Sequence, residues 1–277
     1  MNIQEVINTI KSDFENCIRT GIFDKKQYEN GAKAKEALIR SQKLIMLVHN
    51  NIKEGINNKF GEQYECFPPV GDLKNELSLE GYYKPKFQDI SLVPKDLILE
   101  KDKIKNSERI LTINVRSQLS SLDKNKDTLY ERTFAEALNL HRLHSKQCLG
   151  EVYLIPVYEY DQEAMKNNKV AFSPKASNLE LYIQWFQKIN NRTDKDDHPE
   201  KYERICLLIV DFRLDTPKIY TSTSELIADG LLKTDRVTFD KLDYDSFFDD
   251  LYNIYIERFN PSQTVRDNFS SQVKTNE

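Results

Sequence analysis

The chain has 277 residues, of which 39% are hydrophobic and 30% charged, a balance typical of folded proteins rather than disordered or fibrous ones. With 40 Lys and Arg against 44 Asp and Glu, its formal net charge is −4, which excludes a uniformly basic nucleic-acid coat. No apolar run approaches the roughly 18 residues needed to cross a bilayer, and the first residues lack the pattern of a signal peptide. Four scattered cysteines suit reduced thiols, so we expect an intracellular, cytoplasmic protein.

The charge is distributed unevenly along the chain. Residues 1–150 contain 24 basic and 21 acidic residues, a net charge of +3, whereas residues 151–277 contain 16 and 23, a net charge of −7. Scatter over a solvated surface can also produce a difference of this size. If a polyanion binds, we expect it to bind the first half of the chain.

The N-terminal region has the pattern of a helical unit. Apolar residues recur every three or four positions over residues 3–18 and again over residues 32–48, as on amphipathic helices. A segment containing Pro68, Pro69 and Gly71 follows and indicates a loop. We therefore predict an N-terminal helical unit over residues 1–70.

The rest of the chain alternates between strand and helix patterns. Strands are predicted at residues 77–79, 87–93, 110–119, 152–157 and 205–210, and helices at residues 127–143, 179–189 and 244–259. Asp127 or Thr128 would cap the first of these helices. A charged turn is expected at residues 100–109, a loop at 190–203 and a polar tail at 261–277. This order predicts an α/β domain over residues 71–260, with helices flanking a mixed β-sheet.

Two histidines and a cysteine at the end of one predicted helix have a spacing that could serve a metal. They are His141, His144 and Cys148. No second Cys/His pair completes a tetrahedral zinc site. We therefore expect two helix-end histidines and a buried thiol rather than a structural zinc.

A stronger group of polar residues lies between residues 86 and 136. Asp89 falls within a strand pattern, and the next strand places Asn114, Arg116 and Gln118 on one face because side chains alternate with a period of two. The helix that follows contains Glu131 and Glu136. These two glutamates are separated by about 140° around a helix of 3.6 residues per turn, so only one is expected to face a common site.

These residues resemble the PD-(D/E)xK superfamily, in particular type II restriction endonucleases. The resemblance covers residues 76–157 and rests on the strand-strand-helix order, on Asp89, on the Arg-Ser-Gln segment at 116–118 and on the acidic helix. The chain departs from the family pattern at three positions: Gln88 replaces Pro, Asn114 replaces Glu or Asp, and Arg116 replaces Lys. Asparagine brings no charge to a metal, and arginine stays protonated and cannot act as a base.

The resemblance implies a restriction-endonuclease-like fold and a sequence-specific, Mg²⁺-dependent endonuclease of double-stranded DNA, acting as a homodimer on a palindromic site. It implies that Asp89 and Glu131 hold Mg²⁺, with Glu136 as the second choice and Glu76 as the third choice for the second carboxylate. Arg116 would stabilise charge on the phosphorane, and Gln118 would orient water or a phosphate oxygen. The DNA backbone would contact Lys124, Lys126 and Arg132.

Other interpretations of the same residues remain open. Asp89 and Arg116 could form an ordinary cross-strand pair, Glu131 could be favoured by the helix dipole, and the lysines could belong to a solvated loop. Asn114 and Arg116 favour a catalytically silent DNA-binding or assembly protein that keeps a nuclease-like fold. A third possibility is an interaction protein built on the N-terminal helices.

Overall fold

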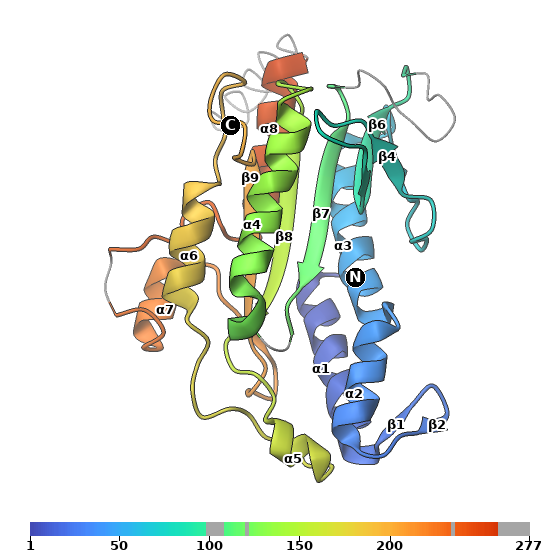
Figure 1. Ribbon diagram of the computed structural model, residues 1–277, viewed down its shortest axis with the longest axis vertical. Coiled ribbons are helices and arrows are strands. Elements are labelled where there is room, and N and C mark those ends of the chain that lie inside the picture. The colour runs from blue at the N-terminus through green and yellow to red at the C-terminus, as the bar shows by residue number, and fades with distance from the viewer. Residues whose placement is uncertain (98–107, 120–121, 234–235, 260–277) are drawn as a thin grey trace, which may run out of the picture.

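The computed structural model describes residues 1–97, 108–119, 122–233 and 236–259, and their centre is one mixed β-sheet (Figure 1). The sheet has six strands in the order β10-β9-β8-β7-β6-β3. Along the chain these are β3 (Tyr64–Phe67), β6 (Ile90–Pro94), β7 (Leu111–Ser117), β8 (Leu149–Pro156), β9 (Arg204–Asp211) and β10 (Lys218–Ile219). The predicted α/β class with a mixed sheet flanked by helices is therefore confirmed.

The sheet combines an antiparallel half with a parallel half. β3, β6 and β7 pair antiparallel, β7, β8 and β9 pair parallel, and β10 returns antiparallel to β9. The parallel step from β7 to β8 requires a crossover, which α4 (Leu122–His141) provides. Every residue of β8 and β9 is buried, which explains their nearly continuous apolar sequence.

Helices cover both faces of the sheet and divide the core into two clusters. One face carries α1 (Ile3–Thr20), α2 (Gly31–Arg40), α3 (Lys43–Phe60) and α8 (Phe247–Phe259), whose apolar residues pack with those of the sheet in a single cluster. The other face carries α4, α6 (Leu179–Lys188) and α7 (Thr223–Ala228). Figure 1 shows α4 and α6 over this face, with α8 behind the sheet.

Two short hairpins and one short helix lie outside this layered arrangement. Strands β1 (Ile22–Phe23) and β2 (Lys26–Gln27) form a hairpin after α1, strands β4 (Leu77–Leu79) and β5 (Lys86–Gln88) form a second hairpin, and α5 (Gln162–Lys166) packs near α2.

No helix in the described ranges is long and apolar enough to span a membrane.

Most of the predicted elements are confirmed, but the bounds of several are wrong. The predicted helix at 32–48 is two helices, because Gln42 adopts a left-handed φ of 62°, and the second helix continues to Phe60. The predicted strand at 87–93 is broken at Asp89 into β5 and β6, and β3 lies within residues 1–70, where no strand is predicted. Helix α4 begins at Leu122, so Asp127 and Thr128 lie inside it and do not cap it. The last predicted helix begins at Phe247 rather than at residue 244. The expected turn at 100–109 falls largely, and the tail at 261–277 wholly, outside the described residues.

Candidate active site

The candidate site begins where β6 separates from β7. Their pairing ends at Ile90 and Ile113, while β7 continues to Ser117. Asp89 lies at this fork and is half-buried. The backbone N–H of Val115 donates to the Asp89 carboxylate at 2.8 Å, and the backbone N–H of Asp89 donates to Oδ1 of Asn114 at 3.1 Å. Asp89 is therefore fixed against the edge of β7 that β6 leaves uncovered.

A row of polar side chains crosses the α4 face of the sheet beside Asp89. Asn114 lies opposite Glu151 of β8 in the parallel register, and Arg116 lies two residues further along the same face of β7. Glu136 reaches the row from α4, and its Oε1 accepts a hydrogen bond from Nδ2 of Asn114 at 3.1 Å. The sheet and the crossover helix thus bring three carboxylates together, and we call Asp89, Glu136 and Glu151 the acidic cluster.

Arg116 forms ion pairs with two members of the acidic cluster. Its Nε donates to Oε1 of Glu151 at 2.5 Å, and its Nη2 donates to Oε2 of Glu136 at 2.9 Å. Burial disfavours the charged guanidinium, but the charges of Glu151 and Glu136 outweigh burial and raise the pKa of Arg116 above its ordinary value. Arg116 therefore stays a cation and cannot serve as a general base.

Glu151 is the least satisfied member of the acidic cluster. It is fully buried, and its Oε2 has no hydrogen-bond partner in the described part of the chain. Burial raises the pKa of Glu151 to about 7, with further increases from the charges of Glu136 and Asp89 and an opposing effect from Arg116. A buried carboxylate oxygen without a partner is costly, so this position favours a proton or a bound cation.

A lysine from the β4–β5 hairpin also reaches the acidic cluster. Nζ of Lys86 lies 3.2 Å from Oε2 of Glu136. The next residue but one, Gln88, is buried and accepts a hydrogen bond from Nδ2 of Asn114 at 3.2 Å. The hairpin is thereby attached to the site through two of its side chains.

Helix α3 contributes two buried basic side chains near Asp89. Burial, together with the charge of Lys53, lowers the pKa of His49 to about 4, while Asp89 opposes this effect. Both ring nitrogens of His49 lack a hydrogen-bond partner among the described residues. Nζ of Lys53 donates to the carbonyl oxygens of Pro69 and Asp72 at 3.2 and 2.7 Å.

Glu76 also lies near Asp89 and Lys53. Burial raises its pKa, Asp89 raises it further, and Lys53 opposes both effects. Asp89 thus lies between the other two members of the acidic cluster, Glu136 and Glu151, on the α4 side and a second group, His49, Lys53 and Glu76, on the α3 side. The negative charge around Asp89 is partly compensated by cations from both sides.

The predicted site residues divide into two groups in the structure. Asp89, Asn114, Arg116 and Glu136 are brought together, whereas the side chains of Glu131, Lys124 and Arg132 are exposed on α4. Lys126 and Gln118 are half-buried, and the backbone N–H of Gln118 extends the pairing of β7 with β8 by donating to the carbonyl of Leu154. The structure therefore favours Glu136 over Glu131 as the helix carboxylate of the site.

Four residues of the site are missing from the sequence-based assignment: His49, Lys53, Lys86 and Glu151. The signal for Glu151 is present in the sequence, because it is a lone carboxylate next to the apolar run Val152–Val157. His49 and Lys53 lie in the part of α3 that follows the predicted helix end at residue 48.

Carboxylate oxygens such as those of the acidic cluster are the donors that a hard divalent cation prefers, and Mg²⁺ is usually bound by one or two carboxylates together with water and substrate phosphate. Within the described ranges, no group of three or more His, Cys, Asp or Glu side chains could hold a metal ion. Two carboxylates, Asp89 and Glu151, would therefore have to bind the cation together with phosphate and water.

His141, His144 and Cys148, whose spacing could also serve a metal, have structural contacts instead. The ring nitrogens of His141 lie 2.9 and 3.1 Å from the carbonyl oxygens of Pro199 and Gln147, and Nε2 of His144 lies 3.1 Å from the carbonyl of Glu80. Cys148 is buried as a free thiol. The expectation of helix-end histidines and a buried thiol agrees with these contacts.

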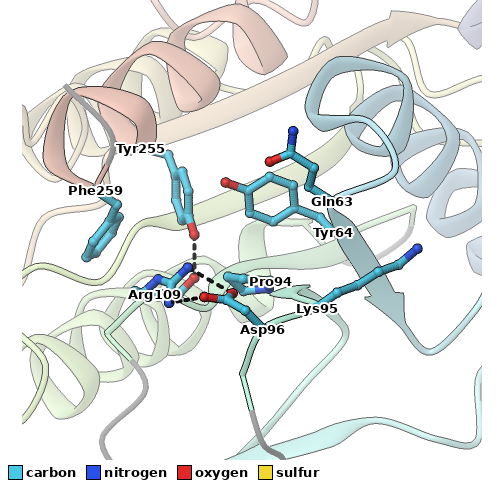
Figure 2. Close-up of a pocket in the computed structure, with 8 residues that line it drawn as sticks. All are labelled: Gln63, Tyr64, Pro94, Lys95, Asp96, Arg109, Tyr255 and Phe259. Carbon is cyan, nitrogen blue, oxygen red and sulfur yellow. Dashed lines mark hydrogen bonds and ion pairs between the residues drawn. The ribbon is translucent and has the colours of Figure 1, made fainter. Parts of the chain in front are cut away.

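Figure 2 shows a cavity of about 380 Å³. It is lined by Arg109, which precedes β7, whereas Arg116 lies near the other end of that strand. Arg109 donates to both carboxylate oxygens of Asp96 at 2.9 and 3.0 Å, and the Tyr255 hydroxyl donates to the Arg109 carbonyl at 2.7 Å. The lining residues are Gln63, Tyr64, Pro94, Lys95, Asp96, Arg109, Tyr255 and Phe259. None of them belongs to the acidic cluster, so this cavity is separate from the candidate site.

Comparison with known proteins identifies no relative. No protein-family model, curated protein or solved structure matches the chain. The function must therefore be argued from the site itself.

Proposed function

We propose that the chain is a Mg²⁺-dependent, sequence-specific endonuclease of double-stranded DNA, of the type II restriction class. The observation that carries this proposal is the buried Glu151 carboxylate, whose Oε2 is unpartnered in the described residues, beside Asp89 at the fork between β6 and β7. Oxygen donors in such surroundings suit a hard cation. The resemblance to the PD-(D/E)xK superfamily adds support, because Asp89, β7 and α4 follow one another in the order that it implies.

The side chains around the fork can be given separate roles. Asp89 and Glu151 would hold the cation, which when bound would polarise a phosphodiester and lower the pKa of a bound water. Arg116, held by Glu136 and Glu151, would stabilise the charge that develops on the phosphate. Lys86, which is ion-paired to Glu136, would offer the phosphate a second positively charged side chain besides Arg116.

The exposed basic residues of α4 would supply affinity rather than chemistry. Lys124 and Arg132 are exposed, and Lys126 is half-buried on the same helix. Contacts from such residues to phosphates carry no sequence information and weaken with salt. A palindromic recognition site would require a two-fold arrangement, so we propose a homodimer as the active form.

A cleavage assay on a long DNA of diverse sequence tests this proposal. The wild-type protein should produce discrete fragments in Mg²⁺ and none in EDTA, and Asp89→Ala should produce none. Lys124→Gln should still cut at the same positions at low salt, because it removes a phosphate contact and leaves the acidic cluster intact. Cutting by Asp89→Ala at the wild-type rate would contradict the proposal.

A second candidate is a DNA-binding or assembly protein that keeps this fold without catalysis. It is favoured by Arg116, which already forms ion pairs with Glu136 and Glu151, and by the uncharged Asn114 between them. Titration calorimetry separates the two candidates. Heat of Mg²⁺ binding that is lost in Asp89→Asn supports the nuclease, whereas tight DNA binding without any Mg²⁺ binding supports the silent protein.

A further inference from the structure

The loop that joins β4 to β5 exposes aromatic side chains next to the candidate site. Tyr82 and Tyr83 in this loop are 60% and 64% exposed, and Phe87 on β5 is 63% exposed. They are the three most exposed aromatic residues among the large hydrophobic side chains of the described residues. The rings of Tyr82 and Tyr83 lie 4.9 Å apart at 83°, an edge-to-face arrangement. Aromatic rings that gather on a surface are typical of a binding site.

The loop is held in place, so the exposure of the rings is not a consequence of a loose segment. Oδ1 of Asn139 on α4 accepts hydrogen bonds from the backbone N–H groups of Tyr83 and Lys84 at 2.8 and 3.2 Å, and its Nδ2 donates to the Lys84 carbonyl at 2.9 Å. The backbone N–H of Tyr82 donates to the Asn139 carbonyl at 2.8 Å. A Cβ on Gly81 would lie 2.2 Å from Nδ2 of Asn139, so only glycine fits there. These hydrogen bonds to the buried Asn139 hold the backbone of Tyr82 and Tyr83 in one position.

Two basic residues, Lys84 and Arg142, accompany the two rings. Lys84 is exposed, and the guanidinium of Arg142 on α4 lies 5.8 Å from the Tyr82 ring centroid, within cation–π distance. Glu80 is the acidic residue of the loop. Aromatic faces interleaved with cations match a nucleic-acid strand, in which bases alternate with phosphates, better than they match an apolar protein partner.

The same hairpin is attached to the candidate site. Lys86 pairs with Glu136 at 3.2 Å, and Gln88 accepts a hydrogen bond from Asn114 at 3.2 Å. Asp89 follows directly in the chain. The hairpin therefore links Tyr82 and Tyr83 to the acidic cluster through one short stretch of chain.

We propose that Tyr82 and Tyr83 form a stacking platform for an unstacked nucleobase of the DNA substrate, with Lys84 and Arg142 binding the neighbouring phosphates. This inference rests on the proposed DNA-binding function. It adds that the substrate presents a base outside the regular stack, in a single strand or in a duplex that is opened locally. Stacking on an aromatic side chain tolerates any base, so the platform contributes affinity and positioning rather than sequence recognition.

Fluorescence anisotropy in EDTA, where hydrolysis does not occur, tests the platform with the full chain. The probes are a short single strand, a fully paired duplex, and the same duplex with a central mismatch. The double variant Tyr82→Ala/Tyr83→Ala should bind the single strand at least tenfold more weakly than wild type, and Tyr82→Phe/Tyr83→Phe should restore the affinity. The matched control is Leu214→Ala, which removes another exposed apolar side chain (48% exposed) and should leave binding unchanged.

The probes also distinguish the two sources of an unstacked base. If the double alanine variant binds only the single strand and the mismatched duplex more weakly than wild type, the platform captures bases that are already unpaired. Weakening that extends to the paired duplex means that the tyrosines open the stack themselves. A 2-aminopurine base in the probe should lose fluorescence on binding wild type and not on binding the double alanine variant.

Equal affinity of wild type and the double alanine variant for all three probes overturns the platform. Loss of a dimer by that variant in analytical ultracentrifugation, with unchanged DNA binding, also overturns it and assigns the rings to contact with a second copy. These results do not depend on hydrolysis. DNA binding that needs the tyrosines but never leads to cutting would refute the proposed nuclease and leave the platform standing.

Discussion

Replacing Glu151 with glutamine should yield a protein that is more stable at alkaline pH and yet inactive. Glutamine has the shape of the protonated acid and keeps an oxygen to accept from Nε of Arg116. Wild-type Glu151 has a pKa of about 7 when folded, against 4.5 for the free side chain. This difference in pKa corresponds to about 3 kcal/mol in the free energy of unfolding, at 1.36 kcal/mol per pKa unit.

The sign of this effect follows from proton linkage. Below pH 4.5 the carboxyl is protonated in both the folded and the unfolded chain, so it does not change the free energy of unfolding. Between pH 4.5 and about 7 the unfolded chain loses the proton and the folded chain keeps it, so stability falls as the pH rises. Above pH 7 the full loss of about 3 kcal/mol is present in wild type and absent in Glu151→Gln.

Urea unfolding followed by circular dichroism in EDTA, at a series of pH values from 4 to 8, measures this difference. The advantage of Glu151→Gln over wild type should grow by about 3 kcal/mol across the series. A constant offset from rearranged hydrogen bonds does not affect that slope. Glu131→Gln is the matched control, because Glu131 is exposed and should give parallel curves. A difference between Glu151→Gln and wild type that is independent of pH would contradict a raised pKa of Glu151 in the folded chain.

Two further stability predictions follow from the buried charges. Arg116→Leu leaves Glu136 and Glu151 buried without their guanidinium partner, so urea unfolding at pH 8 should show a loss of about 3–5 kcal/mol, and a loss below about 1 kcal/mol would contradict the ion pairs. Burial alone would raise the pKa of Glu203, but His141, Arg258 and Arg192 lower it to about 2. A lowered pKa stabilises the folded chain above pH 4.5 and loses that effect as the pH falls towards 2, so Glu203→Gln should cost about 3 kcal/mol more at pH 7 than at pH 2. A deficit of Glu203→Gln that is equal at both pH values in urea titrations would disprove the assignment.

Local patterns in the sequence predicted much of the fold. The three-and-four spacing of apolar residues identified α1, and the continuous apolar runs identified the buried strands β8 and β9. Their limits depend on features that such patterns do not contain. The left-handed backbone at Gln42 divides α2 from α3, and the change of pairing partner at Asp89 divides β5 from β6.

Strand alternation and the family resemblance predicted part of the candidate site. The period of two in a strand placed Asn114 and Arg116 on one face, and the structure brings both next to Glu136. The choice between Glu131 and Glu136 depended on which side of α4 meets the sheet, which is decided by packing across the whole layer. Glu151 comes from the next strand, and its proximity to Asn114 depends on the parallel register of β7 and β8.

The most direct test of the account is the rate of DNA cleavage in Mg²⁺ by Glu151→Gln compared with Glu131→Gln. If Asp89 and Glu151 hold the cation, Glu131→Gln should cut like wild type and Glu151→Gln should show no Mg²⁺-dependent fragments while remaining folded. Wild-type cutting by Glu151→Gln together with an inactive Glu131→Gln would contradict cation binding by Glu151. It would show instead that Glu131, on the exposed face of α4, is the required carboxylate.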